Sequence, residues 1–207
     1  MLGKEDGKVR IAVLVSGGGT NLQALIDAQD KGVIKSGEIV LVVSNKEEAY
    51  ALERAGKAGI KAEVVLRKDF DSQASFEERL DALLSESRID IVVMAGFMSI
   101  LSGSFTARYP DRIINIHPSL IPSFCGKGFY GLHVHEAALR YGVKVTGATV
   151  HFVNEIPDGG RIIKQKAVEV MEGDTAETLQ KRVMEQAEWI ILPEATEEIC
   201  AEIVRGK

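Results

Sequence analysis

Two side chains at the end of an apolar stretch have the types that acyl-group chemistry uses. Asn115 and His117 stand two residues apart in "RIINIHP". In a β-strand such residues point to the same face, and Pro118 should end the strand just beyond them. Asparagine supplies a neutral N–H donor, and histidine supplies a donor or a proton. Two donors that converge on one point are suited to stabilising a developing oxyanion.

A carboxylate is expected beside the imidazole, and "HFVNEIPDGGRII" offers Asp158 in a turn with Gly159 and Gly160. An adjacent carboxylate would orient the imidazole, raise its pKa and relay a proton through water. A plain hairpin turn would use Asp-Gly-Gly equally well, so the spacing leaves both interpretations open. His151, on the strand that leads to this turn, is expected to donate a supporting hydrogen bond to these side chains without contacting the ligand itself.

Three glycines, Gly17 to Gly19, separate a strand from a helix in "VLVSGGGTNLQAL". Such a loop lets a ligand approach the backbone amides, and the new helix presents free N–H groups to a phosphate. Thr20 and Asn21 could cap that helix or add side-chain hydrogen bonds. The third glycine and the acidic residue of a dinucleotide site are missing, and so is the lysine of a Walker A loop. The pattern favours a single phosphate, with a turn that binds no ligand as the alternative.

Neither the cysteines nor the other histidines form a recognisable reactive or metal-binding pattern. Cys125 lies near His117 in the sequence and could be a thiol nucleophile, but a bystander loop cysteine is the preferred interpretation. Cys200 is too distant to suggest a disulfide framework. His133 and His135 lack a cysteine or carboxylate at ligand spacing, so we expect structural roles and no metal.

Short apolar segments alternate with amphipathic ones along most of the chain. This alternation predicts a single-domain α/β fold with a Rossmann-like, mostly parallel twisted sheet flanked by helices. We expect one domain over 1–207, with a mononucleotide-binding half (1–110) and a catalytic half (111–207). The predicted strands are 10–15, 38–45, 61–66, 89–96 and 112–117, then 144–153 and 161–171 as an antiparallel pair. The predicted helices are 21–32, 47–59, 72–87, 101–110, 132–142 and 175–204, the last with Thr175 as N-cap and a break or kink at Pro193.

Composition excludes several classes of function. The net charge of the 207 residues is −5 and no basic stretch is visible, which disfavours nucleic acid as a partner. The longest apolar runs are too short to cross a bilayer, so we expect no membrane partner. No apolar signal region opens the chain, and a cytoplasmic protein acting on small molecules is expected.

Five motifs together resemble the glycinamide ribonucleotide formyltransferase family: "VLVSGGGTNLQAL", "VVMAGFMSILS", "INIHPSLIP", "GLHVHEAAL" and "HFVNEIPDGG". The resemblance covers roughly residues 10 to 193. It implies the formyltransferase fold and transfer of a formyl group to the amine of glycinamide ribonucleotide in purine biosynthesis. The formyl donor would be 10-formyltetrahydrofolate as co-substrate, without a metal. The second half of the chain would then form the folate side of the site.

The resemblance also implies roles for particular residues. Asn115, protonated His117 and Asp158 match the family's catalytic residues. The matches on the ribonucleotide side are Gly19, Thr20, Asn21 and Glu188, although the helix between Val183 and Pro193 is one residue longer than expected. The matches on the folate side are Phe97, Met98, Ser99, Ile100, Leu101, Asn154 and, more weakly, Gln73.

Departures from the family pattern concentrate on the folate side. Some members carry arginine where Ser99 stands, and others where Gln73 stands, in each case suited to the glutamate tail of the folate. Lys127 or Arg161 could serve in their place. The loop "SFCGKGFYG" (123–131) is longer than in family members, and we expect a mobile lid over the folate end.

Three alternatives stay open from the sequence. A formyltetrahydrofolate hydrolase would carry an extra N-terminal regulatory domain, and a methionyl-tRNA formyltransferase would carry a basic RNA-binding domain. A non-catalytic module that binds a phosphosugar would explain the glycine loop but not the Asn115, His117 and Asp158 set. A monomer and a homodimer are both compatible with the sequence.

Overall fold

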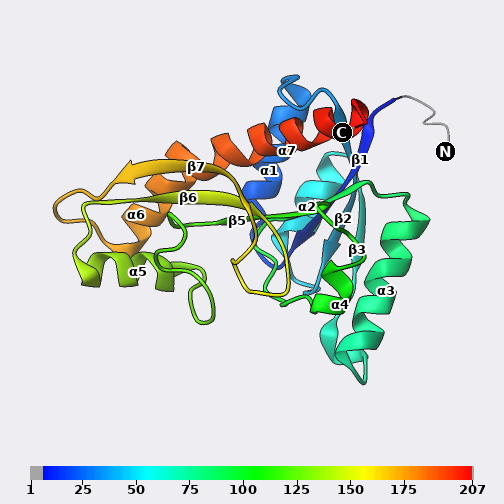
Figure 1. Ribbon diagram of the computed structural model, residues 1–207, viewed down its shortest axis with the longest axis horizontal. Coiled ribbons are helices and arrows are strands. Elements are labelled where there is room, and N and C mark those ends of the chain that lie inside the picture. The colour runs from blue at the N-terminus through cyan, green and yellow to red at the C-terminus, as the bar shows by residue number, and fades with distance from the viewer. Residues whose placement is uncertain (1–6, 207) are drawn as a thin grey trace.

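A computed structural model describes residues 7–206 as one seven-stranded sheet with helices on both faces (Figure 1). The strand order is β3-β2-β1-β4-β5-β6-β7. The first five strands run parallel, β6 pairs antiparallel with β5, and β7 pairs antiparallel with β6. The strands are β1 (Val9–Val15), β2 (Gly37–Ser44), β3 (Lys61–Val64), β4 (Ile91–Met94), β5 (Ile113–His117), β6 (Val145–Phe152) and β7 (Ile162–Glu169).

Helices connect most of these strands and close the chain. The α-helices are α1 (Thr20–Asp30), α2 (Tyr50–Lys57), α3 (Gln73–Glu86), α4 (Gly103–Thr106), α5 (Leu132–Tyr141), α6 (Ala176–Val183) and α7 (Trp189–Val204). Two short elements complete the set, a 3-10 turn η1 (Arg67–Asp69) and a π-helical turn η2 (Met184–Glu188) that joins α6 to α7. Among the described residues, no helix is long and apolar enough to span a membrane.

The alternating side chains of β1 enter two separate apolar cores. Val13 lies in a cluster with Leu25 of α1 and Leu192 of α7 on one face of the sheet. Leu14 points to the other face, where it joins Phe76 of α3. Both faces of the parallel strands are therefore buried, which explains why their sequences are almost continuously apolar.

The predicted fold class is confirmed, and most predicted elements differ from the observed ones only at their ends. The predicted antiparallel pairing of the last two strands and the N-cap at Thr175 are also confirmed. Of the break or kink predicted at Pro193, the break is wrong, because α7 continues through this residue, and the kink stays a prediction. Proline removes a single backbone donor there, and the buried ring packs within the protein. The irregular turn lies earlier, at η2.

The order of the strands gives the carboxyl ends of β1 and β4 a special place in the sheet. The chain leaves β1 toward β2 on one side and reaches β4 on the other side, which makes this point a topological switch. Ligands of open α/β sheets bind at such switch points. The glycine loop follows β1, the segment 95–101 follows β4, and the pair Asn115 and His117 ends β5.

Candidate active site

Asn115 is held by a residue from the neighbouring strand. In the antiparallel pair of β5 and β6, Asn115 lies directly opposite His151. Nδ1 of His151 lies 2.8 Å from the carbonyl oxygen of Phe152 and must donate to it. Nε2 of His151 then accepts from Nδ2 of Asn115 at 3.2 Å. His151 therefore orients the amide of Asn115 and leaves its second amide hydrogen for a ligand, while its own N–H donates to the backbone of Phe152.

Both ring nitrogens of His117 face protein groups. Nε2 donates to the carbonyl oxygen of Phe124 at 2.9 Å, because a carbonyl oxygen can only accept. Nδ1 lies 3.6 Å from Oδ2 of Asp158. The imidazole is 4% exposed, so water has little access to it.

The turn that carries Asp158 brings the carboxylate between two imidazoles. Asp158 has a positive φ of 56°, and its Oδ1 lies 3.6 Å from Nε2 of His151. The backbone N–H of Gly126 donates to Oδ2 at 2.8 Å. A side chain at Gly160 would place its Cβ 1.7 Å from the carbonyl oxygen of Phe152, so only glycine fits there. The structure thus brings together the Asn115, His117 and Asp158 set that the sequence singled out.

Burial controls the charge of this cluster. Burial lowers the pKa of His117, and it outweighs the nearby Asp158 carboxylate and the Phe124 carbonyl, which both act to raise that pKa. Burial therefore opposes the effect expected of Asp158, and the protonation of His117 stays a prediction. Burial alone would raise the pKa of Asp158, but the contacts with His151, His117 and Gly126 reverse the effect and lower it. Both pKa shifts favour a carboxylate beside a neutral imidazole.

The 123–131 loop contributes two backbone groups that the sequence analysis missed. Phe124, at a positive φ of 49°, aims its carbonyl at His117, and its ring packs edge-on against Phe129 and Tyr141. Gly126 binds Asp158 as described above. Backbone groups have no sequence signature, and only the unusual glycine and aromatic content marked this loop. Its observed contacts include His117 and Asp158, while its mobility stays a prediction.

Cys125 lies within the same loop as a weak nucleophile. Its thiol donates to the carbonyl oxygen of Pro122 at 3.3 Å. Burial raises the pKa of the thiol, and the negative charge of Asp158 raises it further. Because the thiolate is the nucleophilic form, these surroundings favour the bystander interpretation.

The glycine loop leads into α1 with the backbone that an anion site requires. Gly19 is the N-cap at φ 69°, and a Cβ there would lie 2.6 Å from the Cβ of Ala51. The first turn of α1 therefore presents free N–H groups at the end of the glycine loop. Thr20 and Asn21 do not cap the helix. Instead, the hydroxyl of Thr20 lies 3.7 Å from Sδ of Met184, so the side chains of this turn reach across to η2.

Glu188 meets Asn21 inside the protein. Nδ2 of Asn21 donates to Oε2 of Glu188 at 2.6 Å, and Glu188 is 6% exposed. Glu188 ends the π-helical turn η2, which begins at Met184. A π-helical turn holds one residue more than an α-helical turn, which accommodates the additional residue that the sequence predicted before Pro193. The irregular helix thereby keeps Glu188 directed at the glycine loop.

We expect Glu188→Gln to stabilise the protein at alkaline pH. Burial raises the pKa of Glu188 from 4.5 to about 7, and the hydrogen bond from Asn21 opposes this only in part. The wild-type stability is therefore fully present below the unfolded pKa and is lost as the pH rises through about 7. At about 1.4 kcal/mol per pKa unit the loss is roughly 3 kcal/mol. Thermal unfolding at pH 8 should show the gain, which should vanish near pH 4.5.

Glu185→Gln is the matched control for this substitution. Glu185 belongs to the same turn but is exposed. Its replacement should leave the melting temperature nearly unchanged at both pH values. Equal gains from the two variants would show that general surface charge, and not the buried carboxyl, limits stability.

The segment after β4, the strand that pairs with β5, offers an apolar surface. Phe97 and Leu101 are buried, whereas Met98 and Ile100 are 49% and 66% exposed. The hydroxyl of Ser99 accepts a hydrogen bond from Asn45 at 2.8 Å. Such exposed apolar side chains, next to backbone polar groups, suit a flat aromatic ligand.

The other residues predicted for the folate side lie around this segment. A Cβ at Gly103 would lie 3.0 Å from the Cβ of Glu155, so the 153–158 turn approaches the start of α4. Within that turn, the side chain of Asn154 accepts from the N–H of Ile156 at 3.0 Å. Gln73 reaches the segment directly, because its Nε2 donates to the carbonyl oxygen of Ile100 at 3.1 Å.

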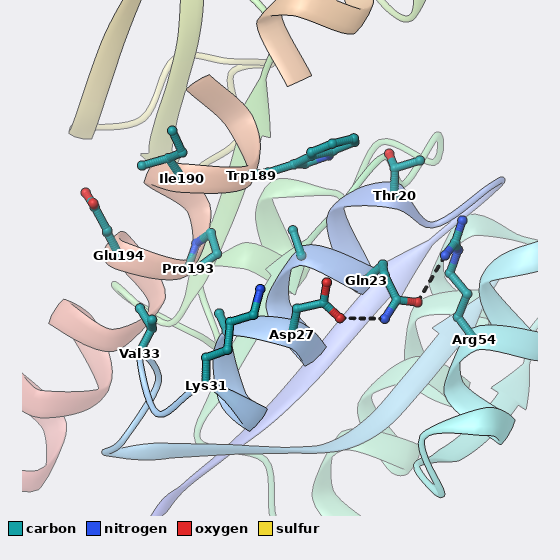
Figure 2. A pocket seen from close by; sticks show the side chains of 12 residues that line it. Thr20, Gln23, Asp27, Lys31, Val33, Arg54, Trp189, Ile190, Pro193 and Glu194 are labelled. Carbon is teal, nitrogen blue, oxygen red and sulfur yellow. Dashed lines mark hydrogen bonds between the residues drawn. The ribbon is translucent and has the colours of Figure 1, made fainter. Parts of the chain in front are cut away.

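A cavity of about 480 Å³ lies between α1 and α7 (Figure 2). Trp189 and Pro193 line one wall, and Figure 2 shows Gln23 bridging Arg54 and Asp27 on the other. The cavity touches the glycine loop only through Thr20, and its walls contain none of the three catalytic side chains. It is therefore separate from the site at the ends of β1, β4 and β5.

The remaining histidines have no shared ligand geometry. His133 pairs with Glu136 on the surface at 3.0 Å, whereas His135 is fully buried. Within residues 7–206, no group of three or more histidine, cysteine, aspartate or glutamate side chains could hold a metal ion.

Comparisons with known proteins agree on one family. The model of the formyl transferase family matches residues 9–196. The chain is 47% identical over 198 residues to the bovine "Trifunctional purine biosynthetic protein adenosine-3". The aligned region covers 96% of this chain but 19% of that protein. The chain therefore spans about a fifth of the length of such relatives. It is also 43% identical over 178 residues to phosphoribosylglycinamide formyltransferase of Escherichia coli strain K12, covering 86% of the chain and 81% of that protein.

A solved structure extends this similarity to three dimensions. Glycinamide ribonucleotide transformylase 1 from Symbiobacterium toebii superposes with a TM-score of 0.88 at 41% identity. The match covers 97% of this chain and 92% of that one.

Proposed function

The chain belongs to the formyl transferase family, and we propose that it transfers the formyl group of 10-formyltetrahydrofolate to the amine of glycinamide ribonucleotide. The product would be a formylated intermediate of purine biosynthesis, with tetrahydrofolate released. The observation that carries the proposal is the cluster of Asn115, His117 and Asp158 at the carboxyl end of β5, beside the glycine loop. We further propose action on small molecules alone, in the cytoplasm, as a monomer or homodimer.

The two substrates would approach from opposite sides of the cluster. The phosphate of the ribonucleotide would accept N–H groups from Gly19, Thr20 and Asn21 at the start of α1. Glu188, beside Asn21, would accept hydrogen bonds from the ribose. The ring of the folate would lie on the segment from Phe97 to Leu101, with Asn154 and Gln73 at its edges. The ribonucleotide would thus be held mainly by the 1–110 half of the chain and the formyl carbon by the 111–207 half.

Attack of the amine on the formyl carbon would build a tetrahedral centre with a negative oxygen. The free amide hydrogen of Asn115 would donate to that oxygen, and His117 would be a second donor. Fixed donors aimed at developing charge are usually the largest catalytic contribution. Nε2 of His117 donates to the carbonyl oxygen of Phe124, so the reacting oxygen would have to replace that carbonyl.

A neutral His117 could take up the proton that the reaction releases. The attacking amine loses a proton as the new C–N bond forms, and the departing folate nitrogen needs one. Because Nε2–H would donate to the reacting oxygen, the imidazole could take up this proton only at Nδ1, beside Asp158, so the proton would reach it through the carboxylate or a water molecule and return to the folate nitrogen by the same relay. The carboxylate of Asp158, 3.6 Å from Nδ1, would stabilise the imidazolium formed between these steps. The reaction needs neither a metal nor a covalent enzyme intermediate.

Release of tetrahydrofolate from 10-formyltetrahydrofolate tests the proposal directly. We expect release only when glycinamide ribonucleotide is present, with one formylated ribonucleotide formed per folate released. Release that ignores the ribonucleotide would identify a hydrolase. No release with both substrates present, together with retained binding of the ribonucleotide, would identify a binding module.

A further inference from the structure

The proposed co-substrate carries negative charge at the end away from its reacting atoms. A folate ends in glutamate, whose carboxylates favour an arginine partner. The segment from Phe97 to Leu101 has no charged side chain, and Ser99 is engaged with Asn45. A cation for the tail must therefore come from another part of the chain.

We propose that Arg67 binds the glutamate carboxylates of the folate, an inference that rests on the proposed function. Arg67 begins the short turn η1, just before α3. Its Nε donates to Oε1 of Gln73 at 3.2 Å. Nε2 of the same Gln73 donates to the carbonyl oxygen of Ile100 at 3.1 Å. One glutamine thus ties the guanidinium to the exposed apolar segment where the folate would lie.

The guanidinium is fixed in place but keeps its charge for a ligand. A second hydrogen bond runs from its NH1 to the carbonyl oxygen of Phe70 at 2.8 Å. Both observed acceptors are neutral, and the ion pairs found among residues 7–206 do not include Arg67. A half-buried arginine held this way retains further N–H donors in the planar fork that matches a carboxylate.

The nearby buried carboxylate does not neutralise Arg67. Glu77 is 2% exposed and accepts from Gln73, from the N–H of Ser102 and from the hydroxyl of Ser102. Glu77 therefore anchors the other side of Gln73 and holds it between Arg67 and Ile100. Gln73 is thus a bridge that positions the cation, rather than the cation itself.

The two cations that the sequence offered for this role are engaged elsewhere or lie on another element. The guanidinium of Arg161 lies over the ring of Phe152, 4.5 Å from its centroid. Lys127 is exposed on the 123–131 loop, whose backbone contacts His117 and Asp158. Neither residue is linked to the 97–101 segment by an observed hydrogen bond.

The test compares 10-formyltetrahydrofolate with 10-formyltetrahydropteroate, which lacks the glutamate. Arg67→Ala should raise KM for the first compound by about ten- to a hundredfold, as expected for a lost charge-assisted hydrogen bond. KM for the second compound and for the ribonucleotide should stay unchanged. An unchanged KM for the glutamate-bearing compound would overturn the proposal. An equal rise for both compounds would also overturn it, because it would show a general effect on the fold.

Two further variants sharpen the result. Lys68→Ala removes the adjacent, exposed cation and should leave KM for both compounds unchanged. Arg67→Ala combined with Gln73→Arg places the charge beside Ile100 again and should recover most of the lost affinity. Wild-type turnover with the two compounds tests the proposed function. The ratio of KM between the variant and the wild type tests the role of Arg67. Failure of the proposed function and failure of the Arg67 proposal are therefore distinguishable. The thermal unfolding curve of each variant verifies that it folds.

Discussion

Replacement of His117 by alanine is expected to lower kcat by about 10²- to 10⁴-fold, the usual contribution of a positioned general acid–base group. The variant loses the group that passes the proton and one donor to the reacting oxygen. Binding of glycinamide ribonucleotide should survive, because the glycine loop and Glu188 make no contact with the imidazole. Steady-state kinetics give kcat, and calorimetric titration of the ribonucleotide gives its dissociation constant.

His133→Ala is the matched control for the His117 variant. His133 is an exposed imidazole that pairs with Glu136, and its loss should leave kcat unchanged. The two variants remove the same chemical group from different surroundings. Turnover of His117→Ala close to that of the wild type would contradict the catalytic role proposed for this residue.

The geometry of the catalytic cluster was predictable in part because strands have a period of two. Asn115 and His117 share a face for that reason alone, and Pro118 marks where the strand ends. The position of Asp158 was harder to predict, because it depends on β6 returning antiparallel to β5 and on a turn that only Gly160 permits. Local sequence describes the turn but not which strand end it approaches.

Other features of the site could not be predicted because they depend on burial or on the backbone. The pKa of His117 is a balance between desolvation and Asp158, and a sequence reveals the partner without revealing the burial. The carbonyl of Phe124 and the N–H of Gly126 are backbone groups. Nearly every residue possesses them, so the sequence does not single them out. Arg67 reaches the folate side through Gln73, a connection between η1 and the segment after β4 that no local pattern contains.

Phe124 links the resting state of the site to its proposed mechanism. Its carbonyl takes the hydrogen bond that the reacting oxygen would need, and this bond orients His117. Gly126, two residues further on, holds Asp158 in the same way. Binding of the folate should therefore shift the 123–131 loop relative to both catalytic side chains, whatever its contacts with the rest of the ligand.

Asp158→Asn is expected to lower kcat by about 10²- to 10⁴-fold while changing its pH dependence. The amide can still accept the hydrogen bond from Gly126, but it cannot stabilise an imidazolium. Because the Asp158 carboxylate raises the pKa of His117, its loss should lower that pKa further. Activity that requires neutral His117 should therefore persist to lower pH in the variant, although at a reduced maximum. Glu155→Gln removes an exposed charge from the same turn and should leave the profile unchanged.

The double variant His117→Ala, Asp158→Asn tests whether the two residues act as one unit. If Asp158 works only through His117, the double variant should be no slower than His117→Ala alone, because residues of one catalytic unit are strongly non-additive. Losses that multiply would instead show that Asp158 handles a proton independently, for example through a water molecule. The cycle therefore separates a carboxylate that stabilises the imidazolium from one that exchanges protons itself, which the 3.6 Å separation of the two groups leaves physically open.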